Sequence, residues 1–79
     1  MMSEDRKVVV VDARFKSCPG PLIAASEAAR RAEPGQVIRI LATDPAAPSD
    51  IREWALEIGH KLLKVSEREN VYEIEIEIR

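Results

Sequence analysis

The chain has 79 residues, of which 33% are charged and 46% hydrophobic, and its formal net charge is −2 at pH 7. A chain of this length has room for one small domain, so we expect residues 1–79 to form a single unit with a two-layered core. The slight negative charge argues against direct nucleic-acid binding, and the lack of a long apolar run or a signal peptide predicts a cytoplasmic protein without a membrane span.

Residues 7–12, with the sequence KVVVVD, predict the first strand, because branched aliphatic side chains favour an extended backbone. The valines are nearly continuous, which predicts that this strand is buried on both faces or close to it. A polar, partly basic loop is expected at residues 13–17.

Residues 22–32 are rich in alanine and predict the first helix, which the Pro-Gly pair at 34–35 ends. Proline is tolerated in the first turn of a helix, because the amide that it lacks would have no partner there. Pro19 and Pro21 therefore place Cys18 at the N-terminus of this helix or one residue before it. An apolar stripe at helical spacing is expected to face the sheet, formed by Leu22, Ala25, Ala29 and Ala32 and broadened by Ile23 and Ala28.

Residues 36–42 predict the second strand, and Ser49 or Asp50 is expected to cap the second helix. We expect Trp54 to belong to the core between the layers. The apolar residues of the second helix recur at helical spacing, at Ile51, Trp54, Ala55, Ile58 and Leu62.

Residues 64–68 and 71–79 predict two strands joined by a turn at Glu69 and Asn70. In the last strand Tyr and Ile alternate with Glu, which predicts one buried face and one face in water. The order β-α-β-α-β-β therefore predicts an α+β fold, a two-layer α/β sandwich with two helices on one face of a four-stranded mixed sheet.

Cys18 is the only cysteine and His60 the only histidine, which excludes an intramolecular disulfide, a Cys-x-x-Cys redox pair and a four-ligand zinc site. We therefore expect no metal and no cofactor. Free cysteines are often small buried hydrophobes, and in that interpretation Cys18 only packs. At a helix N-terminus, however, backbone amides and the helix dipole favour the thiolate, and Arg14 and Lys16 would add positive charge.

A cysteine hydrolase would need a base near the thiol, and the sequence does not place His60 relative to Cys18. A chain this short also has little room for a substrate pocket. Carrying a group on the thiol is therefore favoured over processing a substrate. At the helix end His60 is expected to be structural, and Asp44 is expected to cap local amides through its Asp-Pro turn. Asp12 orients the loop, caps the turn or is simply solvated.

The motif Cys18-Pro19-Gly20-Pro21 has the pattern Cys-Pro-x-Pro, and with the features around it the chain resembles the TusA (SirA-like) family of sulfur-carrier proteins over nearly its whole length. The other matching features, in chain order, are Asp12-Ala13, Pro34-Gly35, Asp44-Pro45 with Asp50-Ile51, and Gly59-His60 followed by Leu62. The two-layer fold of the family agrees with the order of elements predicted above.

The resemblance implies that Cys18 carries sulfur as a persulfide, as a sulfurtransferase-type carrier. The sulfur would come from a donor protein such as a cysteine desulfurase, a rhodanese or a DsrE-like protein, and would pass to an acceptor protein. In this family the destinations include thiolation of tRNA and molybdenum-cofactor biosynthesis. Relatives in sulfur-oxidising microbes pass sulfane sulfur or carry thiosulfate as a thiosulfonate.

The loop before the motif departs from the family pattern, because Phe15 stands where many members have glycine. An aromatic ring there would shield the sulfur or belong to a docking face, and Arg14, Phe15 and Lys16 are the candidate contacts with a donor or partner. The sequence Arg-Phe-Lys-Ser before the motif resembles the sulfur-oxidation branch more than the tRNA-thiolation branch. Two alternatives remain open: a non-catalytic interaction or regulatory module with a structural cysteine, and RNA binding, which rests on the likeness of the fold to a translation initiation factor domain.

Overall fold

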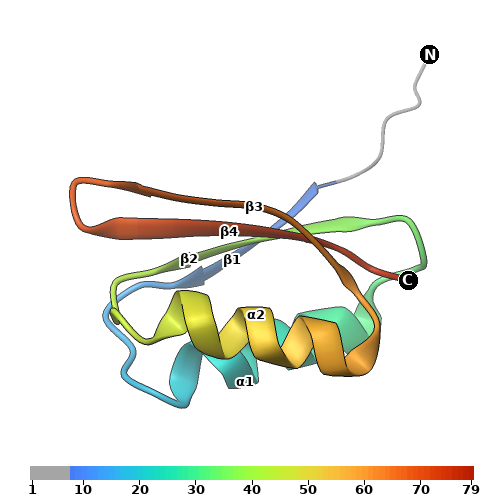
Figure 1. Ribbon diagram of the computed structural model, residues 1–79, viewed down its shortest axis with the longest axis horizontal. Helices are drawn as coiled ribbons and strands as arrows, with labels where there is room; N and C mark the ends of the chain where they lie inside the picture. The colour runs from blue at the N-terminus through green and yellow to red at the C-terminus, as the bar shows by residue number, and fades with distance from the viewer. Residues whose placement is uncertain (1–7) are drawn as a thin grey trace.

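The computed structural model describes residues 8–79, and it has the six predicted elements in the predicted order (Figure 1). Lys7, the first residue of the predicted first strand, lies outside the described residues. None of the described helices is both long enough and apolar enough to cross a membrane. The elements are β1 (Val8–Ala13), α1 (Gly20–Arg31), β2 (Val37–Ala42), α2 (Ala47–Ile58), β3 (Lys61–Arg68) and β4 (Val71–Glu77).

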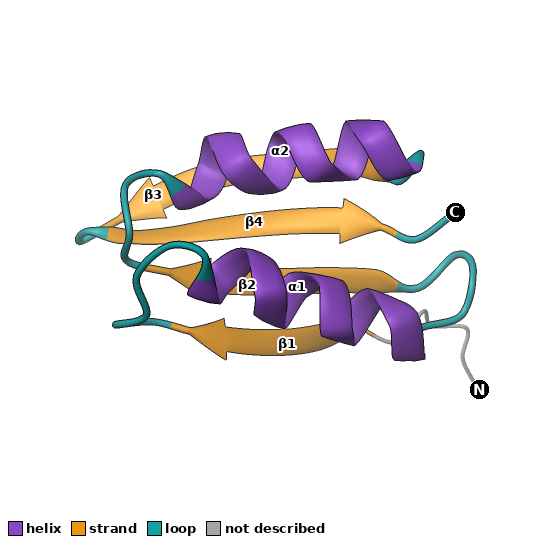
Figure 2. Cartoon of the chain, turned by 90° about the horizontal axis from the view of Figure 1, so that it is seen from below, coloured by secondary structure: helices purple, strands orange, loops and turns teal. Residues whose placement is uncertain are grey.

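The four strands form one mixed sheet in the order β1-β2-β4-β3. β1 pairs with β2 in parallel, while β4 pairs antiparallel with both β2 and β3. Both helices cover the same face of the sheet, α1 over β1 and β2 and α2 over β3 and β4 (Figure 2). This arrangement confirms the predicted two-layer α+β sandwich.

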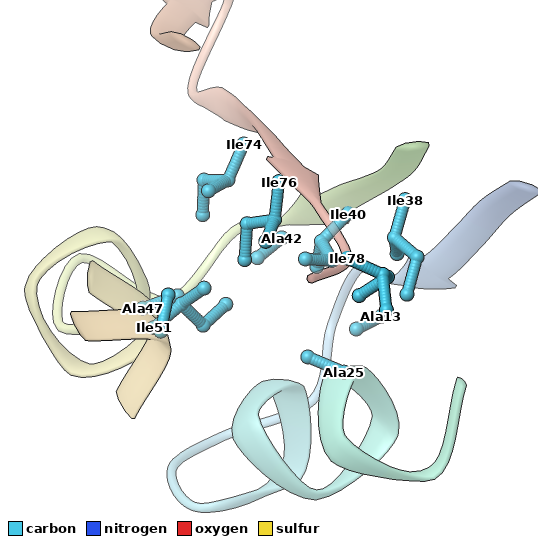
Figure 3. Close-up of a cluster of buried hydrophobic side chains, with 11 residues drawn as sticks. Ala13, Ala25, Ile38, Ile40, Ala42, Ala47, Ile51, Ile74, Ile76 and Ile78 are labelled. Carbon is cyan, nitrogen blue, oxygen red and sulfur yellow. The ribbon is translucent and has the colours of Figure 1, made fainter. Parts of the chain in front are cut away.

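The core lies between the two central strands and the helices, and isoleucine dominates it (Figure 3). Ile38 of β2 lies opposite Ile76 of β4 in the sheet, and Ile40 lies opposite Ile74. All four side chains are essentially buried. The helices contribute Ile51 and small residues such as Ala25, whose size lets the helix backbone approach the sheet closely. The alternation predicted for the last strand is therefore confirmed.

The opposite face of β4 carries its glutamates, which meet a cation from the neighbouring strand. The Nε of Arg39 on β2 lies 2.8 Å from a carboxylate oxygen of Glu75, its partner in the sheet register. The same guanidinium lies 3.8 Å from Glu73. Charged side chains on this face keep it in water, so only one face of the sheet receives helices.

The prediction that the first strand is buried is wrong. β1 is an edge strand, and Val8, Val9 and Val10 are 43%, 36% and 55% exposed. An edge strand has a neighbour on one side only, and a groove of about 380 Å³ stays open between the valines of β1 and α1. Only its last residue, Ala13, is fully buried.

The second helix begins earlier than predicted. Its N-cap is Ala46, which makes no side-chain cap, so neither Ser49 nor Asp50 caps the helix. Asp44 takes over part of this role, because its Oδ1 accepts a hydrogen bond of 3.1 Å from the Ala46 amide. Asp50 instead lies inside the first turn of α2.

Two positions of the predicted apolar stripes are exposed, Ile58 at 59% and Ile23 at 51%. Ile58 lies on the rim of a groove between α1 and α2 rather than against the sheet. Trp54 is half-buried and packs at the edge of the core, which agrees in part with its predicted place. Leu62 belongs to β3, because Gly59, at φ 99°, ends α2.

Candidate functional site

Cys18 is exposed on the loop between β1 and α1. Pro19 is the N-cap of α1, so the thiol belongs to the residue before the cap, as the sequence predicts. The Gly20 amide donates a 2.7 Å hydrogen bond to the Ser17 carbonyl, which closes a tight turn around Cys18. Pro21 is buried in the first turn of α1. The Cys-Pro-x-Pro motif therefore turns the chain into the helix directly behind the sulfur.

Gly20 occupies a position where a larger residue would collide with the preceding loop. A Cβ placed on Gly20 would lie 2.8 Å from the Cβ of Lys16, closer than two such atoms approach in proteins. The Cβ of Lys16 is fixed by its backbone and cannot swing away. The glycine of the motif thus allows the loop that carries the cysteine to fold tightly against the start of α1.

Asp44 fixes the position of Cys18 from the loop between β2 and α2. Its Oδ2 accepts a hydrogen bond of 2.7 Å from the Cys18 amide, while its Oδ1 accepts the bond from Ala46. The loops that follow the parallel strands β1 and β2 lie at the same end of the sandwich, beside the N-termini of both helices (Figure 2). The predicted capping role of Asp44 is confirmed, and the amide of Cys18 is an additional partner.

Asp50 of α2 contacts the thiol directly, since its Oδ2 lies 3.4 Å from Cys18 Sγ. This hydrogen bond is the main reason why the pKa of the Cys18 thiol lies above its ordinary value. Partial burial and the negative charges of Asp50 and Asp44 raise the pKa further. A hydrogen bond to a carboxylate favours the protonated thiol, because two anions would otherwise face each other.

The expectation that the start of α1 stabilises the thiolate is therefore wrong for the free protein. The effect of a helix dipole is largely confined to the first turn, and Cys18 lies before the cap of α1. Its own amide is already bound to Asp44. The hydrogen bond to Asp50 and the negative charges of Asp50 and Asp44 act in the opposite direction and raise the pKa of the thiol.

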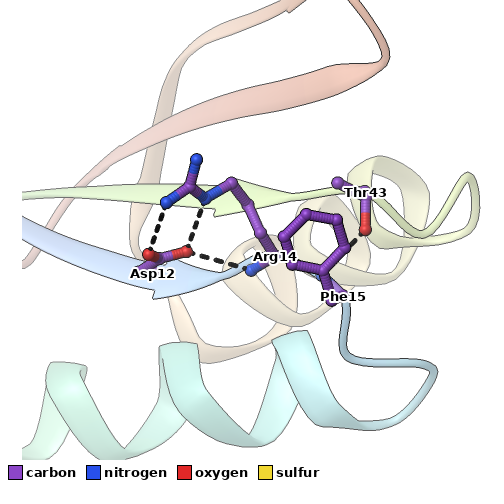
Figure 4. Close-up of polar contacts among 4 residues, drawn as sticks. All are labelled: Asp12, Arg14, Phe15 and Thr43. Carbon is purple, nitrogen blue, oxygen red and sulfur yellow. Dashed lines mark hydrogen bonds and ion pairs between the residues drawn. The ribbon is translucent and has the colours of Figure 1, made fainter.

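Arg14 is bound to Asp12 rather than to the cysteine (Figure 4). Its Nε and Nη2 each lie 2.9 Å from a different oxygen of the Asp12 carboxylate, and its amide donates to the same side chain. The contacts lower the pKa of Asp12 to about 2, chiefly through the side-chain hydrogen bonds from Arg14. Asp12 therefore orients the loop, one of its predicted roles, and Arg14 is already paired in the free protein.

Phe15 has a backbone conformation that glycine adopts more readily. Its φ is 67°, in the left-handed region, which costs a residue with a side chain about 1–2 kcal/mol. Its amide donates a 2.9 Å hydrogen bond to Thr43 Oγ1, which holds the loop in this shape (Figure 4). The side chain is 87% exposed, so the ring covers too little to shield the sulfur. Phe15, Thr43 and Asp44 border one shallow pocket of about 250 Å³ together with Lys16 and Ser17.

His60 lies at the other end of α2 from the thiol. Its ring packs edge-on against Trp54 at a centroid distance of 5.5 Å, and its Nδ1 accepts a hydrogen bond from the Arg79 amide. It lies ten positions after Asp50, and most of the residues between them are helical, which corresponds to roughly 15 Å at the rise of an α-helix. The only histidine therefore makes structural contacts and forms no Cys-His pair with Cys18.

Residues 9–78 match the sequence model of a protein family described as sulfurtransferase TusA. The chain is 39% identical over 67 residues to a protein of Archaeoglobus fulgidus that is provisionally named a sulfur carrier, a match that covers 85% of this chain and 92% of that one. It is 30% identical over 63 residues to the sulfur carrier protein TusA of Pseudomonas aeruginosa, covering 80% of each.

A longer relative occurs in Aquifex aeolicus and also has a provisional sulfur-carrier name. It is 40% identical over 68 residues, which are 86% of this chain but only 33% of that protein. Among solved structures, a SirA-like protein of Desulfitobacterium hafniense superposes with a TM-score of 0.79 at 25% identity, covering 87% of this chain and 95% of that one.

Proposed function

Because this chain belongs to the TusA family of sulfur carriers, we propose that Cys18 accepts a sulfane sulfur from a donor protein and passes it to an acceptor thiol. The observation that carries the proposal is the exposed thiol of Cys18 at the end of the sandwich. The hydrogen bond from the Cys18 amide to Asp44 holds this residue in place. A carrier needs an accessible nucleophile and a surface on which partners dock. It needs neither a catalytic base nor an enclosed substrate cavity.

The transfer is an exchange at sulfur. The Cys18 thiolate attacks the terminal sulfur of a donor persulfide, so a bond forms between Sγ and that sulfur while the S–S bond of the donor breaks. The donor cysteine leaves as a thiolate and takes up a proton. In the second step the acceptor thiolate attacks the terminal sulfur on Cys18, and Cys18 leaves as a thiolate. Each step breaks one S–S bond and forms another, so no external oxidant or reductant is needed.

The donor in this proposal is a cysteine desulfurase, a rhodanese or a DsrE-like protein, and the carrier works in the cytoplasm. The sequence Arg-Phe-Lys-Ser before the motif resembles the sulfur-oxidation branch more than the tRNA-thiolation branch, and Phe15 in it is exposed where a partner would meet it. In that branch the cargo is a sulfane sulfur or a thiosulfonate.

The alternative in which Cys18 only packs in the protein finds less support. A structural cysteine acts as a small buried hydrophobe, whereas Cys18 is exposed and its sulfur contacts a carboxylate. The RNA-binding alternative has no observation in its favour beyond the likeness of the fold.

The proposal is tested by weighing the intact protein after incubation with thiosulfate, tetrathionate or a persulfide-loaded sulfurtransferase. We expect the mass to increase by one sulfur, or by one thiosulfonate group, and the adduct to disappear on reduction. The Cys18→Ser variant should gain nothing. An unchanged mass with every donor, or the same adduct on the variant, would contradict the proposal.

A further inference from the structure

The contact between Cys18 and Asp50 joins positions 32 residues apart, and the fold holds it in place. The Asp50 amide donates to the Ala46 carbonyl within the first turn of α2, and the neighbouring Ile51 is fully buried. An ionised carboxylate can only accept hydrogen bonds, so in this 3.4 Å contact the sulfur is the donor and the hydrogen bond exists only while Cys18 is protonated. The arrangement thus suits a thiol and disfavours a thiolate.

The charges that act on the Cys18 thiol within the described part of the chain are both negative, those of Asp50 and Asp44. Of the nearby cations, Arg14 is bound to Asp12, and the positive charge of Lys16 helps to lower the pKa of Asp12. Within residues 8–79 the acidic members of the ion pairs are Asp12, Glu73 and Glu75, so neither Asp44 nor Asp50 is paired with a cation there. Asp50 and Asp44 thus give the surface around the sulfur a negative charge that a basic partner would complement.

We propose that Asp50 keeps Cys18 protonated in the free carrier, and that a lysine or arginine of the sulfur-donor protein pairs with Asp50 on docking and removes this restraint. The inference rests on the proposed function. Asp50 is a positioning residue here, because it acts through the Cys18 thiol that it contacts.

The steps balance without a further reactant. When the donor's cation neutralises Asp50, the thiol loses its proton to solvent and the thiolate attacks the donor persulfide. The donor's cysteine leaves as a thiolate and takes up a proton, so the net change is the movement of one sulfur atom. The free carrier meanwhile holds a protonated, poorly nucleophilic thiol, which limits its reaction with oxidants before a donor binds.

Phe15 adds an apolar element to the same surface. Its exposed ring borders the shallow pocket that also includes Asp44, and Asp44 holds the Cys18 amide. The donor that fits this surface therefore carries a lysine or arginine beside its persulfide and an apolar recess for one aromatic ring. Aromatic side chains, phenylalanine among them, are enriched in protein–protein interfaces relative to the rest of the surface.

The restraint on the thiol is tested by the rate of alkylation with iodoacetamide between about pH 6 and 9, which follows the thiolate fraction. For Asp50→Asn we expect the profile to move to lower pH and the rate near neutral pH to rise several-fold. Glu53→Gln is the matched control, since Glu53 is an exposed residue of the same helix, and it should behave as the wild type. Thermal melting of both variants checks that they fold. An unchanged or slower profile in Asp50→Asn overturns the inference.

The role of the cation is tested with three small disulfides that exchange with Cys18: cystamine, which is cationic, the neutral bis(2-hydroxyethyl) disulfide and the anionic dithiodipropionate. We expect the wild type to react several-fold faster with cystamine than with the anionic reagent, and Asp50→Asn to lose much of this preference. A wild type without the preference for cystamine, or an Asp50→Asn variant that keeps the preference in full, overturns the proposed role of the donor's cation. Neither assay needs a sulfur donor. The proposed role of Asp50 can therefore be refuted while sulfur loading is observed, and sulfur loading can be refuted while the role of Asp50 is observed.

Discussion

Replacing Ile51 with alanine should lower the free energy of unfolding by about 2–5 kcal/mol. Ile51 is fully buried, and from α2 it reaches into the isoleucine cluster of β2 and β4 (Figure 3). Alanine would leave a cavity that the surrounding side chains fill only in part. A domain of this size has a total stability of about 4–12 kcal/mol, so this substitution should remove a large share of it.

The measurement is urea denaturation followed by circular dichroism, with Ile58→Ala as the matched control. Ile58 lies two turns further along α2 and loses the same atoms in the substitution, but it is 59% exposed. We expect its loss of stability to be much smaller. Equal losses in the two variants would mean that the core is not built around Ile51 as the structure places it.

Replacing Asp44 with alanine should remove the clamp that holds the cysteine loop to the start of α2. Asp44 accepts one hydrogen bond from the Cys18 amide and one from the Ala46 amide, with a different oxygen for each. Hydrogen bonds to a charged group each contribute about 1.5–3 kcal/mol, and we expect a loss of at least that size because both donors lose their partner. The Cys18 amide should also lose its protection against hydrogen exchange.

The Asp44→Asn variant refines this test. Its side chain keeps one accepting oxygen, so it can serve one of the two amides and should fall between the wild type and Asp44→Ala in denaturant unfolding. Asp12→Ala is a second comparison, since it removes an exposed ion pair with Arg14 and a local hydrogen bond from the Arg14 amide, and it should cost less. A Cys18 amide that stays protected in Asp44→Ala would contradict the clamp.

The order of the elements was predictable because each has its own periodicity. Alternation of isoleucine and glutamate identified β4 and its buried face, and the Pro-rich motif identified the start of α1. The place of β1 in the sheet was not predictable in this way. Its four valines favour a strand, but hydrophobicity alone does not distinguish a central strand from an edge strand beside an open groove.

The site was predictable only where neighbours in the sequence make it. The position of Cys18 before α1 follows from Pro19 and Pro21, both within three residues. Its contacts with Asp44 and Asp50 span 26 and 32 positions and depend on how the two loops meet at one end of the sandwich. The residues next to Cys18 in the sequence therefore predicted a thiolate at the helix end. The two carboxylates that favour the thiol come from distant positions and were not predicted.

The sequence indicated that Phe15 departs from the family pattern, but not why glycine is common at this position. The family pattern has glycine at this position, and the left-handed backbone of Phe15 gives the physical reason for a glycine there. A bulky side chain kept in such a conformation and left 87% exposed has no packing role in the free protein. We expect the ring to contact the donor protein at the proposed docking surface.

A relay with heavy-isotope sulfur tests whether sulfur passes through Cys18. The carrier is loaded with a heavy sulfane sulfur, freed of excess donor, and mixed with an acceptor protein that has a reactive cysteine, and both proteins are weighed intact over time. We expect the heavy sulfur to leave Cys18 and to appear on the acceptor at the same rate, and we expect Cys18→Ser to transfer none. Heavy sulfur that stays on the carrier, or that reaches the acceptor equally fast with Cys18→Ser in place of the carrier, would contradict transfer through Cys18.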